Sequence, residues 1–180
     1  MSYSNKVLIQ GENVLIRYPI KEELKFIRSL WEDEETMKPV GGPIFMNDEA
    51  YDRWFNEYVI ENSGTFYYLI LTKDQEPIGE ISYEMIDKEK CIAMFNLKIH
   101  AKHRRRGYAI DSMINFLNYV FNQQGLAIMC DEIGNDNFVS QNLFLKFGFK
   151  HKKEKSKHVW TEMTRDEFNS LYQDKIYQQS

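Results

Sequence analysis

The chain has 180 residues, of which 28% are charged, and its net charge is −4. This length suits one domain that buries a core without disulfides or metal ions. Cys91 and Cys130 lie far apart in apolar runs and lack the spacing of metal ligands, so we expect two reduced, buried thiols and no metal. No secretory signal opens the chain and no apolar run approaches the roughly 18 residues of a membrane span, so we expect a soluble, cytoplasmic protein without a membrane partner.

Charge is unevenly distributed along the chain. Residues 21–61 contain eleven Asp and Glu against five Lys and Arg, whereas residues 98–106 contain five Lys and Arg and no acid. A solvated helix surface explains many acidic segments of this kind. The short basic cluster predicts a site that attracts anions, and the acidic segment predicts a face that attracts cations.

The N-terminal half alternates strands and helices. The apolar periodicity predicts a strand over 13–18 and a helix over 21–30. The prolines and glycines of 39–47 predict a loop, after which Asn47 or Asp48 caps a helix that runs to about residue 61. Two β-rich runs, 65–71 and 77–83, read as a hairpin, and a third strand follows over 91–99.

The C-terminal half continues with a helix that begins near Ala109, a strand over 126–130 and a short helix capped by Asp136 or Asn137 and stopped by Gly148. A strand, helix and strand in this order predict parallel pairing of the strands on either side of the helix. A final hairpin over 149–150 and 159–163, with the basic connection KKEKSKH, and a helix over 165–172 complete the prediction. We expect one domain over 1–180, with its core at about 13–163.

The segment between the third strand and the following helix is the first functional signal. The arginines Arg104, Arg105 and Arg106 precede Gly107 and the start of the helix. The free N–H groups of a helix N-terminus, the helix dipole and guanidinium groups all favour phosphate. Glycine allows a backbone conformation, or a close approach, that a side chain prevents. This pattern alone is weak, because a run of three arginines also occurs in nucleic-acid-binding surfaces.

A second motif follows, formed by Asn137, Ser140, Leu143, Phe144, Gly148 and Phe149. Together with Arg104-x-x-Gly107-x-Ala109, in this order and spacing, it resembles the GCN5-related N-acetyltransferase (GNAT) superfamily. The resemblance covers about 13–163. The stretch LWEDEETMKPVGGP near the N-terminus is also similar, more loosely, to ribosomal-protein alanine, spermidine and 6′-aminoglycoside acetyltransferases.

The resemblance implies an α/β fold with a mixed, twisted sheet that splays open at the acyl-CoA site and is flanked by helices. It implies acetyl-CoA as the co-substrate and no metal. It assigns cofactor contacts to Leu97, Lys98, Ile99, Arg104, Arg105, Arg106, Gly107, Tyr108, Ala109, Asn137 and Phe144. A plain helix cap remains an equal reading of Asn137.

The amine acceptor must lose a proton before it attacks, because an ammonium group has no lone pair. Glu132 is the predicted base, since similar N-terminal acetyltransferases place a glutamate five residues before the motif asparagine. A surface glutamate at a strand end is the alternative. Glu80 and Glu84 are reserve candidates, and Ala93 stands where histone-type members carry their base.

Phe144 departs from the family pattern. Many members carry a tyrosine there, whose hydroxyl is thought to protonate the departing thiolate, and phenylalanine has no proton to donate. Water, Tyr108 or Tyr83 are possible substitutes. The departure leaves open a CoA-binding protein that acetylates poorly or not at all.

We therefore expect an N-acetyltransferase, monomeric or homodimeric, that acts on a small-molecule or peptide amine. The predicted acceptors are a protein N-terminus or a cationic amine such as a polyamine or aminoglycoside, because the acids of 32–61 attract cations. The alternatives are a catalytically silent CoA-binding regulator and a nucleic-acid-binding module that uses 102–106 and 150–157. The aromatic residues are not interleaved with the basic ones, which disfavours nucleic acid.

Overall fold

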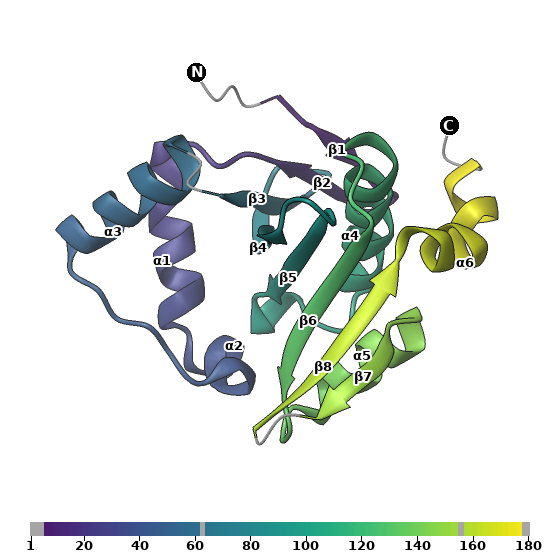
Figure 1. Cartoon of the computed structure of the whole chain (residues 1–180). Helices are drawn as coiled ribbons and strands as arrows, with labels where there is room; N and C mark the ends of the chain where they lie inside the picture. Colours follow the sequence, from purple (N-terminus) through teal and green to yellow (C-terminus); the bar gives the residue numbers. More distant parts are fainter. Residues whose placement is uncertain (1–5, 62–63, 155–156, 178–180) are drawn as a thin grey trace.

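A computed structural model describes residues 6–61, 64–154 and 157–177. Its centre is an eight-stranded sheet in the order β1-β2-β3-β4-β5-β6-β8-β7 (Figure 1). Neighbouring strands are antiparallel except β5 and β6, which are parallel. The strands are β1 (Ile9–Gln10), β2 (Val14–Arg17), β3 (Thr65–Thr72), β4 (Pro77–Asp87), β5 (Ile92–Ile99), β6 (Ile128–Gly134), β7 (Lys150–Glu154) and β8 (His158–Thr164).

The described ranges contain six α-helices, of which the first five lie between strands and the sixth follows the last strand: α1 (Leu24–Glu32), α2 (Glu34–Met37), α3 (Asp48–Trp54), α4 (Tyr108–Asn118), α5 (Phe138–Phe147) and α6 (Arg165–Tyr177). α3 and α4 each continue into a wider π-helical segment, Phe55–Ile60 and Tyr119–Gln123. Short 3₁₀ turns occupy Lys21–Glu23, Lys38–Val40 and Ala101–His103.

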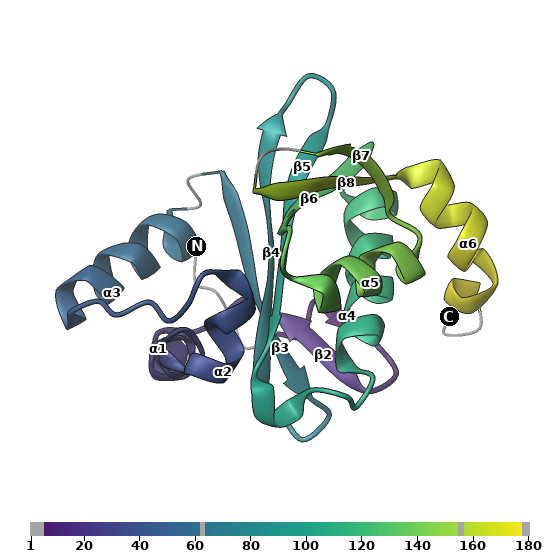
Figure 2. The same cartoon turned by 90° about the horizontal axis from the view of Figure 1, so that it is seen from below.

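The sheet separates two hydrophobic cores. α1, α2 and α3 cover one face, and α4, α5 and α6 cover the other (Figure 2). The first core joins α1 and α3 to alternate residues of β3, for example Trp31, Phe55 and Leu69. The second, larger core joins the other helices to β4, β5 and β6, for example Phe95, Phe116 and Met129. Strand alternation thus assigns each strand residue to one of two chemically separate faces.

The predicted hairpin, the parallel pairing and the final hairpin are confirmed. Asn47 caps α3, with its side chain accepting a hydrogen bond from the N–H of Ala50. The last strand before the Asn137 motif was predicted to end at Cys130, but β6 runs to Gly134 because β8 pairs along its whole length. Two elements were not predicted: β1 has two residues, and α2 is a single turn capped by Asp33. Elements this short carry no periodicity.

Both cysteines are free thiols, but only Cys130 is buried, and Cys91 is half-buried at the start of β5. No helix within 6–61, 64–154 and 157–177 is long and apolar enough to cross a membrane.

Candidate functional site

The two central strands of the sheet separate partway along their length. β5 and β6 pair only from Ile92 opposite Ile128 to Met94 opposite Cys130. Beyond that point β5 continues to Ile99 with pairing to β4 alone. The backbone groups of β5 that face the gap are therefore open to an extended ligand, as the edge of a sheet is.

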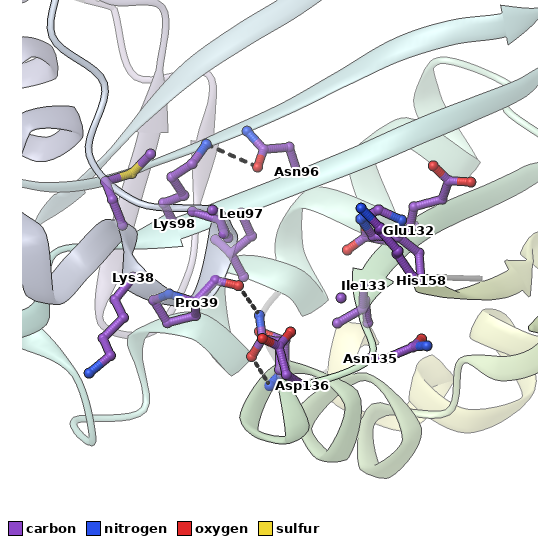
Figure 3. Close-up of a pocket in the computed structure, with 18 of the residues that line it drawn as sticks. Lys38, Pro39, Asn96, Leu97, Lys98, Glu132, Ile133, Asn135, Asp136 and His158 are labelled. Atoms are coloured by element: carbon purple, nitrogen blue, oxygen red, sulfur yellow. Dashed lines mark hydrogen bonds between the residues drawn. The ribbon is translucent and has the colours of Figure 1, made fainter. Parts of the chain in front are cut away.

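A pocket of about 780 Å³ lies between the separated strands (Figure 3). This volume is typical of small-molecule sites. Asn96 and Lys98 on β5 form one wall, whereas Glu132 on β6 and His158 on β8 lie on the opposite side. The turn after α2, the loop before α5 and α5 as far as Phe144 complete the lining, so the pocket draws on segments that are distant in sequence.

Asn137 joins two of these segments at the pocket. Its side-chain oxygen accepts the N–H of Ser140 at 3.1 Å, and its amide nitrogen donates to the carbonyl of Pro39 at 3.0 Å. Asn137 is 7% exposed. The predicted cap is confirmed, and the second hydrogen bond fixes the loop after α2 against α5. The role of Asn137 toward a cofactor stays a prediction.

The loop between β5 and α4 presents the start of a helix without a side-chain cap. α4 begins at Tyr108, and the residue at its N-cap is Gly107, which has no side chain to accept the first helical N–H groups. Gly107 has a φ of 82°, in the left-handed region. A Cβ placed there meets no atom within 4 Å. Of the two predicted reasons for glycine, the structure therefore supports backbone conformation rather than close packing within the protein.

The three arginines of this loop have different environments. The guanidinium of Arg104 donates to the carbonyl oxygens of Glu35 and Thr36, at 3.2 and 2.9 Å. Arg104, Arg105 and Arg106 are all exposed, but only Arg104 forms hydrogen bonds to α2 among the described residues. Arg104 thus anchors the loop to α2, and the phosphate contacts expected of the three arginines stay predictions.

Glu80 is fully buried behind the β5 wall of the pocket. One of its oxygens accepts hydrogen bonds from Trp31 Nε1 at 2.7 Å and from the Tyr67 hydroxyl. The other accepts from Lys98 Nζ at 2.5 Å and from Asn96 Nδ2 at 3.5 Å. Because both oxygens are occupied, this reserve candidate holds Lys98 in place and is a poor acceptor for a substrate proton.

Glu132 and Asp131 both line the pocket but point to different faces of β6. Asp131 alternates with Met129 and Ile133, which belong to the core beneath α4 and α5. Glu132 therefore points toward the face of α1, α2 and α3. Burial raises the pKa of Asp131 to about 7. The other reserve, Glu84, is exposed on β4 and lies outside the pocket lining.

The ring of Phe144 forms part of the pocket lining and of the larger core. It is 4% exposed and packs against Phe149 and Phe95, with ring centroids 4.7 and 5.8 Å apart. The remaining predicted cofactor contacts divide between two places. Leu97 and Lys98 line the pocket, whereas Ile99, Tyr108 and Ala109 pack on the core at the end of β5 and the start of α4.

The acidic segment does not supply the acids of the pocket. Among the described residues, no Asp or Glu of 32–61 is part of the lining, and Glu32 and Asp48 form ion pairs with Arg28. The pocket instead contains the three acids Asp131, Glu132 and Asp136. The expectation that the acids of 32–61 raise the local concentration of a cation stays a prediction.

The basic segments are partly neutralised by the protein itself. Lys150 forms an ion pair with Glu167 at 2.5 Å, and Lys102 lies 3.8 Å from Glu76. Residues 155 and 156 of the basic connection lie outside the described residues. These pairings reduce the positive charge that a nucleic acid requires.

Asp131, Lys38 and Pro39 belong to the site and were not identified from the sequence. An acid within the apolar run from Leu126 to Ile133 was the available signal for Asp131. The positions of Lys38 and Pro39 depend on α2, which carried no signal. Within the part of the chain that the structure describes, no cluster of His, Cys, Asp and Glu is arranged to hold a metal ion.

Comparison with known proteins identifies the fold. Residues 13–150 match the sequence model of a family described as "Acetyltransferase (GNAT) domain". No curated protein sequence matches the chain.

Several solved structures resemble the whole chain. A spermidine N-acetyltransferase from Vibrio cholerae, solved with CoA and spermine, is 15% identical with a TM-score of 0.78, over 88% of this chain and 99% of that one. A GNAT-family acetyltransferase from Bacillus anthracis is 16% identical with a TM-score of 0.74, over 88% and 98%. A nucleotide-linked sugar GNAT is 16% identical with a TM-score of 0.79, over 96% and 98%. At these identities the likeness concerns the fold.

Proposed function

Because this chain belongs to the GNAT acetyltransferase family, we propose that it transfers the acetyl group of acetyl-CoA to the nitrogen of a primary amine. The observation that carries the proposal is the pocket between β5 and β6, which lies on the strand that leads into the uncapped start of α4. A sheet that opens beside a helix N-terminus offers backbone groups to an amide-containing arm and N–H groups to a pyrophosphate.

The residues fit acetyl-CoA in two parts. Arg105, Arg106 and the N–H groups after Gly107 would hold the pyrophosphate, since they are exposed and unhindered by a cap. The open edge of β5 at Leu97 would hold the pantetheine arm. When bound, acetyl-CoA supplies a thioester, whose carbonyl carbon is the acceptor for the amine.

Glu132 is the proposed base that takes the proton of the ammonium group, directly or through water. It lines the pocket on the face of α1 and α2, where the loop after α2 forms a separate wall. The other two glutamates considered are excluded by position: Glu80 is buried with both oxygens occupied, and Glu84 lies outside the lining.

The proposed acceptor is a small cationic amine, such as a polyamine or aminoglycoside, or a protein N-terminus. The three acids of the lining can pair with a cation, and of its three lysines Lys98 is already bound to Glu80. The shared fold with a spermidine N-acetyltransferase supports including polyamines among the candidates. The proposed reaction, a direct transfer from a thioester to an amine within one domain, implies no metal.

A catalytically silent CoA-binding regulator is the second candidate. The observation in its favour is Phe144, which has no hydroxyl and packs in the core beside the pocket. The regulator binds CoA but releases no thiol with any amine, so the two functions predict different results in one assay.

The test combines binding and turnover. Acetyl-CoA should raise the melting temperature, as any ligand of the native state does. It should also release thiol with at least one amine from a panel of polyamines, aminoglycosides, amino acids and N-terminal peptides.

Gly107→Val forces a β-branched residue into the left-handed region and should abolish the thermal shift. Gly125→Val, also at positive φ but on the turn after α4, is the matched control and should retain it. An equal shift in both variants would place CoA elsewhere.

A further inference from the structure

We propose that Asp131 is the general acid of this enzyme and protonates the departing CoA sulfur in place of the hydroxyl that Phe144 lacks. The inference rests on the proposed acetyl transfer and names a catalytic residue for it. Its basis is the place of Asp131 at the fork of the sheet.

Asp131 is the first residue of β6 beyond the paired part of the two strands. The last pair is Met94 with Cys130, and continuing the register by one step sets Asp131 opposite Phe95. Side chains alternate along a strand, so Asp131 points to the same side as Met129 and Ile133, which belong to the larger core. Phe95 belongs to the same core, so Asp131 and Phe95 lie on the same side of the sheet. Phe144 packs on Phe95 from that same side. Asp131 and Phe144 thus lie on the same side of the sheet, and both residues line the pocket.

The surroundings of Asp131 disfavour its ionised form on balance: the backbone N–H of Glu132 stabilises the carboxylate, but burial outweighs this hydrogen bond. Its side chain is half-buried, and among the described residues no side chain donates to its carboxyl group. The Thr161 hydroxyl donates a hydrogen bond to the Asp131 main-chain oxygen, at 3.4 Å, and leaves the carboxyl group untouched. A carboxyl group placed in this way keeps its proton more readily than one in water.

Charged groups near Asp131 do not reverse this effect. On β5, Lys98 favours the ionised form, but its ammonium group is already bound to Glu80 at 2.5 Å. On β6, the neighbouring Glu132 disfavours it. α5 contributes Phe144 to this end of the pocket. The remaining charged or titratable residues of the lining are Lys38, Asp136, Lys157 and His158.

The resulting acidity suits the step. Burial raises the pKa of Asp131 to about 7, so the group is about half protonated at neutral pH. A thiol has a pKa of about 8.5, so transfer of the proton from this carboxyl group to a thiolate is favourable. A general acid works best when its pKa is near the working pH.

The step balances with two carboxyl groups on opposite faces of β6. Glu132 first takes one proton from the ammonium group and passes it to water. The neutral amine nitrogen then forms a bond to the acetyl carbon and gives a second proton to Glu132, while the C–S bond breaks with its electron pair on sulfur. The proton of Asp131 moves to that sulfur and gives the free thiol. Glu132 then returns its proton to water and Asp131 takes one up, so each turnover consumes only the amine and the thioester.

The first test compares Asp131→Asn with the wild-type protein and with Asp174→Asn, a matched change at an exposed position on α6. Turnover of acetyl-CoA with the best amine of the panel should fall on the order of tenfold to a hundredfold in Asp131→Asn, while Asp174→Asn stays within about twofold. The Kd of CoA should remain unchanged. Adding Phe144→Tyr to Asp131→Asn should restore part of the lost turnover, because the tyrosine supplies a proton donor from the same side.

The second test needs no turnover. Carboxyl carbon NMR of the wild-type protein, with the Asp131 signal assigned by its loss in Asp131→Asn, should show a midpoint near pH 7. A midpoint near 4 would overturn the proposal, because the group would hold no proton to give at neutral pH. Turnover of Asp131→Asn within threefold of an active wild type would also overturn it. A wild type that binds CoA but acetylates no amine would instead refute the proposed function itself.

Discussion

Two carboxyl groups lie near the point where β5 and β6 separate, on opposite faces of the sheet, and their surroundings differ. Glu80, on the side of α1, is fully buried and accepts hydrogen bonds from Trp31, Tyr67 and Lys98. Asp131, on the side of α5, is half-buried and receives no comparable set of donors, and burial raises its pKa to about 7.

The difference shows that burial and hydrogen-bond donors together decide what a carboxyl group does in this protein: burial raises the pKa of Asp131, whereas the donors around Glu80 occupy both of its oxygens. A buried carboxylate with its oxygens fully hydrogen-bonded is fixed in one position and becomes part of the framework. A partly buried group such as Asp131, for which burial outweighs the backbone hydrogen bond from Glu132, keeps an exchangeable proton. The framework role therefore falls to the deeper residue, and the proton-transfer role falls to the shallower one.

The largest effect is expected at Glu132, which points to the same face as Glu80 but lines the pocket. Glu132→Gln removes the proposed base and should lower turnover by roughly 10²- to 10⁴-fold. The affinity for CoA should change little, because the proposed CoA contacts lie on β5 and the loop after it. Glu84→Gln, on β4 and outside the pocket, is the control. Near-normal turnover of Glu132→Gln across the pH range would assign the base elsewhere.

The next effect concerns stability. Glu80→Ala removes the partner of Lys98 and leaves the Trp31 and Tyr67 donors unsatisfied, which should lower the free energy of unfolding by about 3 to 5 kcal/mol. Urea unfolding monitored by tryptophan fluorescence measures this loss. Glu84→Ala, exposed on the same strand, should change the free energy by less than about 0.5 kcal/mol. A loss below about 1 kcal/mol for Glu80→Ala would contradict the framework role.

The Asp131 side chain should lower the stability of the folded protein at neutral pH, whereas the Glu80 side chain raises it. Its pKa of about 7 in the folded protein exceeds the value of about 3.9 expected when unfolded, so the native state binds the proton more tightly. The contribution of this bound proton to the stability of the folded protein is complete below about pH 4 and is lost as the pH rises through 7.

Asp131→Asn removes this pH dependence. The free energy of unfolding of the variant, minus that of the wild type, should rise by about 1 to 2 kcal/mol when the pH is raised from 5 to 8. This value is reduced because Asp131 is partly exposed. Denaturant titrations at the two pH values measure the gain, and Asp174→Asn should show none. An equal pH dependence in the variant and the wild type would place the raised pKa on another group.

The smallest effect is expected for Phe144→Tyr in the otherwise wild-type chain. If Asp131 already protonates the sulfur, a second donor is redundant, and turnover should change by less than about threefold, or about 0.7 kcal/mol of barrier. The same substitution has a larger effect in the Asp131→Asn background. A large gain in the wild-type background would indicate that the enzyme otherwise lacks a general acid.

Much of the fold was readable from local patterns. The hairpin of β3 and β4, the amphipathic helix α4 and the cap at Asn137 depend on residues within one turn or one strand, where sequence and conformation are directly linked. Parallel pairing of β5 and β6 followed from the crossover helix between them. The family motif around Gly107 and Asn137 also consists of short, local segments.

The sequence by itself thus determined the family, the order of elements and the loop at the start of α4. The tertiary structure alone decided which partners each charged side chain has, and hence what it can do at the site. Arg104 binds carbonyl groups of α2, Glu80 meets donors from α1 and β3, and Asp131 faces the core at the point where two strands part. Each outcome depends on contacts between segments that are distant in sequence, and the chemistry of a carboxyl or guanidinium group is set by those neighbours rather than by its adjacent residues.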